Sequence, residues 1–96
     1  EGDEIAKALG DKKVAILQNH GILTTGPSVD IALWFYMSME RCCQAQLMAE
    51  AAGKPVVIPH DTAVKTREFI ANDIAAWASY QPAFDKIIKM QPDLLD

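Results

Sequence analysis

The segment between Ser28 and Gly53 constrains the fold of this chain more than any other feature of the sequence. Ser28 can cap a helix through its hydroxyl, and Asp30 lies in the first turn, where the helix dipole favours a negative charge. Gly53, followed by Lys54 and Pro55, is typical of a helix end. The pattern predicts one helix of about 25 residues, nearly 40 Å long at roughly 1.5 Å per residue.

Apolar side chains cover most of the circumference of this predicted helix. At steps of roughly 100° per residue, only a narrow polar strip remains. The strip holds Asp30, Arg41 and Gln44, and the apolar residues are Ile31, Trp34, Phe35, Tyr36, Met39, Cys43 and Leu47. A chain of 96 residues can hardly cover such a helix on several sides. We therefore expect more chain upstream or neighbouring subunits against it, and self-association as a homo-oligomer.

Two short runs that favour β-structure precede the long helix. The runs "KKVAILQ" and "ILTT" flank the turn "NHG", and Gly26 and Pro27 follow them. This arrangement predicts a β-hairpin whose register stays open. Upstream, residues 3 to 9 have the pattern of the last turns of a helix, closed by Gly10.

The chain after the long helix predicts further helices. "PVVIP" predicts a short extended segment, and apolar residues at loosely helical spacing predict a helix over 61–78 with Asp61 as its cap. "PAFDKIIKM" predicts one more helix with Pro82 in its first turn.

Composition excludes several classes of function. The 9 basic residues are outnumbered by 13 acidic ones, and no basic cluster could neutralise a run of phosphates, so nucleic acid is not an expected partner. The longest apolar run, Ile31 to Met37, is too short to span a membrane. Cys42 and Cys43 are adjacent and cannot readily bridge each other, so we expect reduced thiols and a cytoplasmic location. Because the chain begins at Glu1 without a signal peptide, we expect an internal start.

His20 is the strongest candidate for chemistry. A histidine in a tight turn is often only a polar turn residue, but flanking strands would hold this turn rigidly, and histidine is the commonest protein ligand of metals. A catalytic zinc usually takes three protein ligands. His60 is most simply a residue that precedes a helix, and Cys42 and Cys43 project about 100° apart on the long helix. A metal site with His20 would therefore need residues from outside this chain.

The stretch "AILQNHGILTTGPSVDIALWFYMSMERCCQAQLMAEAAGKP" resembles the C-terminal part of the class II aldolase/adducin domain. The shared pattern is an apolar strand, Asn-His-Gly, a second strand that ends in Gly, and a long helix. The resemblance implies an α/β chain that forms part of a three-layer α/β/α domain, with a β-hairpin, a long helix and C-terminal helices. Residues 1–58 would be the C-terminal portion of the domain, and residues 59–96 its helical tail. Members usually assemble as tetramers.

The resemblance also implies a function for the parent protein. Enzymes of the family hold zinc, or another divalent metal, with three histidines, of which the third corresponds to His20. They act on small hydroxy-carbonyl or sugar-phosphate compounds as aldolases, epimerases, dehydratases or decarboxylases. The upstream His-x-His and the catalytic glutamate of the family are missing here, so we expect these residues alone not to catalyse a reaction. In some members a late tyrosine reaches the site of a neighbouring subunit, which makes Tyr80 a catalytic candidate.

A second function stays open. The family also includes adducin-like members without catalysis, in which the same domain serves oligomerisation or cytoskeletal binding. The apolar helix fits both functions, because both require assembly. An upstream His-x-His would favour the enzyme, and its absence would favour the binding domain.

Overall fold

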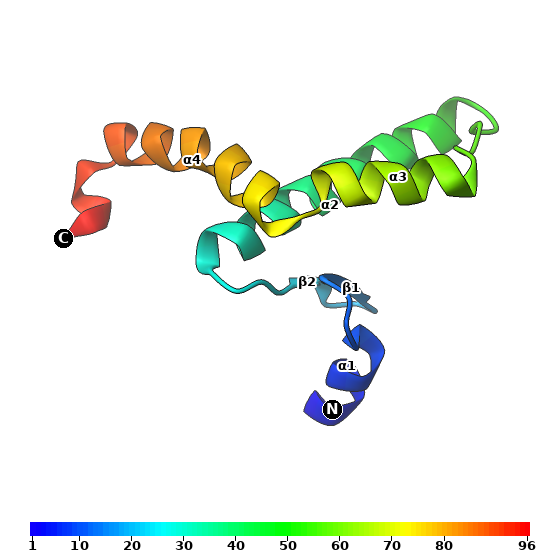
Figure 1. Ribbon diagram of the computed structural model, residues 1–96, viewed down its shortest axis with the longest axis horizontal. Coiled ribbons are helices and arrows are strands. Elements are labelled where there is room, and N and C mark those ends of the chain that lie inside the picture. Colours follow the sequence, from blue (N-terminus) through cyan, green and yellow to red (C-terminus); the bar gives the residue numbers. More distant parts are fainter.

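A computed structural model describes all 96 residues of the chain. A hairpin and a short N-terminal helix lie on one side of a long helix, and two more helices follow it (Figure 1). The elements, in chain order, are α1 (Gly2–Leu9), β1 (Val14–Leu17), β2 (Gly21–Thr24), α2 (Val29–Ala52), α3 (His60–Ile70), α4 (Asp73–Met90) and the short 3₁₀ helix η1 (Pro92–Leu95).

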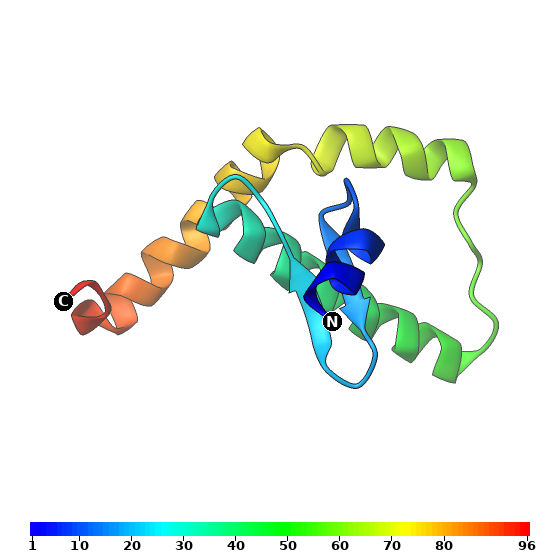
Figure 2. The same ribbon diagram turned by 90° about the horizontal axis from the view of Figure 1, so that it is seen from below.

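The predicted hairpin is confirmed, and the structure defines its register. The strands β1 and β2 pair antiparallel from Val14 opposite Thr24 to Leu17 opposite Gly21, and they form a sheet of two strands. Figure 2 shows the hairpin crossing the long helix, with the turn between the strands projecting away from the other elements. The hairpin thus presents its turn at the edge of the molecule.

The long helix is also confirmed, with Ser28 at its predicted capping position, but the predicted capping bond from the Ser28 hydroxyl is not made. The helix α2 has Ser28 at the N-cap position and ends at Gly53, whose N–H donates to the Ala49 carbonyl at 3.1 Å. The Ser28 hydroxyl makes no capping bond to the backbone. It interacts instead with the Asp30 carboxylate, and this hydrogen bond is the main reason why the pKa of Asp30 lies below its ordinary value.

The core of the chain is small. Only Ile31, Phe35 and Ala76 are buried, where the first half of α2 meets α4. Along the second half of α2, Leu47 and Met48 remain exposed to 67% and 65%. The chain therefore leaves most of the apolar surface of α2 without a covering element.

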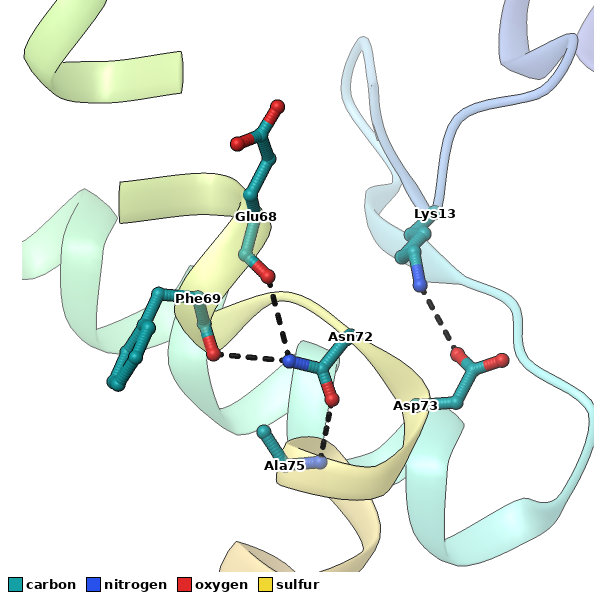
Figure 3. Close-up of polar contacts among 6 residues, drawn as sticks. All are labelled: Lys13, Glu68, Phe69, Asn72, Asp73 and Ala75. Atoms are coloured by element: carbon teal, nitrogen blue, oxygen red, sulfur yellow. Dashed lines mark hydrogen bonds and ion pairs between the residues drawn. The ribbon is translucent and has the colours of Figure 1, made fainter. Parts of the chain in front are cut away.

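The segment predicted as one helix over 61–78 is two helices, and Asn72 separates them. Its Nδ2 donates to the Phe69 carbonyl at 2.9 Å, and its Oδ1 accepts from the Ala75 N–H at 2.9 Å (Figure 3). One side chain thus satisfies backbone groups at the end of α3 and at the start of α4. The sequence prediction followed the apolar spacing and missed this cap.

Two further details of the C-terminal helices correct the sequence predictions. Asp61 is not a cap, because the backbone of Pro59 starts α3 at His60, and Asp61 lies within the first turn. Pro82 does not start a helix but lies inside α4. The cap at Asn72 starts α4 well upstream, so the helix passes through Pro82 without a backbone hydrogen bond from that residue.

Lys13 connects the start of the hairpin to the start of α4. Its Nζ donates to Asp73 Oδ1 at 3.0 Å (Figure 3). The same ammonium lies 4.8 Å from the centroid of the Phe35 ring. Exposed ion pairs contribute little by themselves, but the aromatic ring adds an attraction to the cation. Lys13 thereby holds the corner between α3 and α4 next to the hairpin.

The helix α3 makes its backbone contacts with α4 rather than with α2. It runs back along α2 and the two helices spread apart toward their connecting loop, as Figure 2 shows. Near the α3–α4 corner an open groove of about 400 Å³ lies between α2 and these helices, and Trp34, Phe69 and Ile70 are among its apolar lining residues.

None of the helices combines the length and the apolar character needed to cross a bilayer.

Candidate functional site at the hairpin turn

The turn that carries His20 is built from backbone hydrogen bonds. Leu17 and Gly21 form the last strand pair, and the His20 N–H donates to the Leu17 carbonyl at 3.1 Å. This bond closes a β-turn with Gln18 and Asn19 at its centre. Asn19 has a φ of 60°, which makes it the residue with left-handed backbone conformation at the third turn position.

The side chain of His20 is exposed, and one of its ring nitrogens is engaged. Nδ1 lies 3.0 Å from the carbonyl oxygen of Gln18. Because a carbonyl can only accept a hydrogen bond, Nδ1 is the donor, and the neutral ring carries its lone pair on Nε2. Nε2 makes no hydrogen bond within the chain. His20 is therefore oriented as a ligand that can bind a metal through Nε2.

The other metal-binding residue types do not join His20. No group of three His, Cys, Asp or Glu residues comes together in the chain. His60 starts α3, whose backbone contacts are with α4, whereas His20 lies in the hairpin turn. Cys42 is exposed and Cys43 half-buried on α2, and both are free thiols. His20 therefore stands alone in this chain, and a zinc site with three protein ligands would need two further groups.

The base of the hairpin is fixed to α2 by contacts that the sequence prediction did not identify. Thr24 Oγ1 donates to the Ala32 carbonyl at 2.9 Å. A Cβ on Gly26 would lie 2.9 Å from Ile31 Cγ2 and 3.1 Å from the Ala32 nitrogen, so the backbone approaches α2 here as closely as glycine permits. The available signal in the sequence is Gly26 itself, shortly after the second strand, where the pattern predicts only the end of that strand.

A second polar contact holds α4 against the start of α2. Gln81 Nε2 donates to Asp30 Oδ2 at 3.1 Å and to the Trp77 carbonyl at 3.1 Å. The hydrogen bond from Ser28 lowers the pKa of Asp30 most, desolvation raises it by less, and the hydrogen bond from Gln81 lowers it by a still smaller amount. The start of α2 is thus tied both to the hairpin and to α4.

Tyr80 lies in α4 and is half-buried. Its ring centroid is 6.4 Å from that of Phe84, in a tilted arrangement. The backbone of α4 packs on α2 rather than on either strand, so this chain does not bring Tyr80 to His20. A catalytic role for Tyr80 across a subunit boundary stays a prediction.

Comparisons with known proteins identify the relatives of this chain. Residues 1–47 match the family described as Class II Aldolase and Adducin N-terminal domain. "Decarboxylase NovR" of Streptomyces niveus is 39% identical over 98% of this chain and 35% of its own length. A "4-hydroxy-3-prenylphenylpyruvate oxygenase/4-hydroxy-3-prenylbenzoate synthase" of Streptomyces roseochromogenus subsp. oscitans is 37% identical over 98% of this chain and 34% of its own length.

A solved structure extends this relationship to the fold. The L-fuculose 1-phosphate aldolase from Glaciozyma antarctica PI12 superposes with a TM-score of 0.93 and 38% identity, over 97% of this chain and 37% of that one. This confirms the predicted α/β class, with a hairpin, a long helix and C-terminal helices. The chain spans about a third of the length of the curated relatives that it matches. The matched sequence and fold show that the chain belongs to the class II aldolase/adducin domain family.

Proposed function

We propose that the protein containing this chain is a metal-dependent lyase of the class II aldolase type, and that His20 is one ligand of its catalytic metal. The metal is zinc or another divalent ion, and its remaining ligands lie outside these 96 residues. The substrate is a small hydroxy-carbonyl or sugar-phosphate compound. The chain alone does not catalyse the reaction.

The observation that carries this proposal is the orientation of His20. The Gln18 carbonyl engages Nδ1 and leaves Nε2 available on an exposed turn. Histidines that bind metals commonly donate their second ring N–H to a carbonyl or carboxylate in this way. The relatives named as an aldolase and a decarboxylase support an enzyme, because both names describe cleavage of a carbon–carbon bond.

The residues of this chain have a limited but defined part in the chemistry. A divalent metal, when bound, would polarise a substrate oxygen and stabilise negative charge that develops on it. His20 would hold the metal through Nε2, and Gln18 would orient the imidazole through its carbonyl. The contacts of Thr24 and Gly26 with α2 would keep the hairpin in place during the reaction.

The test is the zinc content of the intact protein and of two histidine variants. We expect about one zinc per chain in the wild type, because a catalytic site of this kind holds a single ion. His20→Ala should lose the zinc, whereas His60→Ala, at the exposed start of α3, should keep it. Elemental analysis after dialysis measures both, and thermal unfolding verifies that the variants are folded. Zinc retained by His20→Ala would disprove the assignment.

An adducin-like role is the alternative, and it makes the opposite prediction. A protein of this kind would use the same fold for oligomerisation or cytoskeletal binding and would have no zinc for His20 to hold. Zinc absent from both wild type and His20→Ala would favour this role, which the adducin portion of the matched family makes reasonable. Self-association and a cytoplasmic location are proposed for either function.

A further inference from the structure

We propose that Asn19 is a positioning residue for His20, and that it acts through its backbone conformation. The inference rests on the proposed metal function only for its consequence at the metal. Asn19 has a φ of 60°, and it is the only residue other than glycine with a positive φ in the chain. Its side chain makes no hydrogen bond, so its contribution to the turn is the left-handed backbone itself.

The left-handed conformation of Asn19 determines where the Gln18 carbonyl points. In a β-turn closed by Leu17 and His20, residue 19 occupies the third position, where a positive φ is the mark of a type II turn. A type I turn has the same ends but a central peptide rotated by roughly 150–170°. That rotation would carry the Gln18 carbonyl to the other side of the turn, away from His20 Nδ1.

The direction of this carbonyl in turn selects the form of the imidazole. The bond of 3.0 Å between Nδ1 and the Gln18 oxygen keeps the proton on Nδ1 and fixes the plane of the ring. Nε2 is then left with its lone pair toward solvent. Asparagine and glycine are the residues that tolerate the left-handed region at little cost, whereas a β-branched residue there is an outlier.

The same backbone geometry accounts for the sequence "QNHG" of the turn. The residue before the histidine must adopt a positive φ, and Gly21, with a φ of 132°, completes the return into β2. Gln18 contributes only its carbonyl to His20, so its side chain is free to vary. Position 19 and not position 18 is therefore the one where a substitution should disturb His20.

The experiment compares Asn19→Val with two matched controls in the intact protein. Asn19→Gly removes the amide but retains the left-handed backbone, and Gln18→Ala removes a side chain but retains the carbonyl. The first measurement is the tautomer of His20 in the metal-free protein, read from ring ¹⁵N chemical shifts at a pH where the imidazole is neutral. The His20 signals are assigned by their loss in His20→Gln. The second measurement is zinc affinity by competition with a chelator.

We expect the Nδ1–H tautomer in the wild type, in Asn19→Gly and in Gln18→Ala, and a loss of this preference in Asn19→Val. Zinc affinity should fall by about 10- to 100-fold in Asn19→Val, as for other groups that orient a metal-binding histidine, and should stay near wild type in both controls. If Asn19→Val does not fold, Asn19→Ala provides the same comparison with a smaller steric penalty.

Three results would overturn the inference. They are an Nε2–H tautomer in the wild type, an effect of Asn19→Gly as large as that of Asn19→Val, and unchanged zinc affinity in Asn19→Val. A protein that binds no zinc but shows the expected tautomers would support the positioning by Asn19 while it rejects the metal function. The two proposals can thus fail separately.

Discussion

At the scale of single residues, Gly26 is the glycine of this chain that leaves the least space for a side chain. An added Cβ would meet Ile31 Cγ2 at 2.9 Å and the backbone nitrogen of Ala32 at 3.1 Å. The helix backbone cannot move aside easily, so we expect Gly26→Ala to lower the free energy of unfolding by about 1–3 kcal/mol, the usual cost of overpacking. Chemical denaturation of the intact protein measures the change. Gly2→Ala, where a Cβ meets nothing within 4 Å, is the control.

Equal stability of the two glycine variants would show that the close approach at Gly26 is not constrained.

The residues of the site were predictable to different degrees. The identity and the turn position of His20 followed from the sequence, because a polar residue between two β-favouring runs must lie in the connection. The partner of Nδ1 did not, because the Gln18 carbonyl is a backbone group, and its direction depends on a dihedral angle that residue types restrict without defining.

At the scale of elements, Pro82 weakens the helix that contains it. Proline has no N–H to donate to the Ala78 carbonyl, and a proline inside a helix destabilises it by about 3 kcal/mol. Proline also restricts the unfolded chain, which stabilises the folded state by about 1 kcal/mol. We therefore expect Pro82→Ala to raise the free energy of unfolding by roughly 2 kcal/mol. Pro92→Ala, at the start of η1 where no N–H is required, should change it little. Thermal and chemical unfolding compare the two variants.

A loss of stability in Pro82→Ala would mean that the break in the hydrogen-bond pattern has a packing role.

The helix boundaries also show which features of the fold could be predicted from the sequence. The bounds of α2 were predicted to within a residue, because a capping position and a glycine mark both ends of a long apolar segment. The division between α3 and α4 was missed, because both helices have apolar residues at similar spacing and one asparagine provides the break. Likewise, a proline marks a helix start only when no stronger cap precedes it.

At the scale of the whole molecule, the chain is too open to bury its own apolar residues. Its radius of gyration is 15.7 Å, whereas a compact domain of this length has one of about 12.5 Å. Phe69, which lines the apolar groove, is exposed to 83%, and Ile74 and Trp77 of α4 are exposed to 82% and 50%. We therefore expect the 96-residue chain to form dimers or larger species at micromolar concentration in sedimentation velocity.

A variant on this surface sharpens the sedimentation experiment. Phe69→Glu should shift the distribution toward smaller species, whereas Glu68→Gln, at the exposed position before it in α3, should not. A monomeric wild-type chain would contradict the expectation. The need for a covering surface was predictable from the apolar circumference of α2. The identity of that surface was not, because no element of this chain covers the second half of α2. The division of the chain between residues 58 and 59 also stays a prediction.

Because the base of the hairpin is attached closely to α2, a small rotation at the base displaces the turn at the far end of the hairpin. The strands are four residues long and anchored at the Thr24 end, so the turn lies roughly 13 Å from the pivot at about 3.3 Å per residue. A rigid tilt of about 5° at the pivot would move His20 by about 1 Å, an error that can cost an active site about 100-fold in rate. The contact of Thr24 with Ala32 and the close approach of Gly26 to Ile31, which fix the pivot, therefore control the position of the distant His20 imidazole.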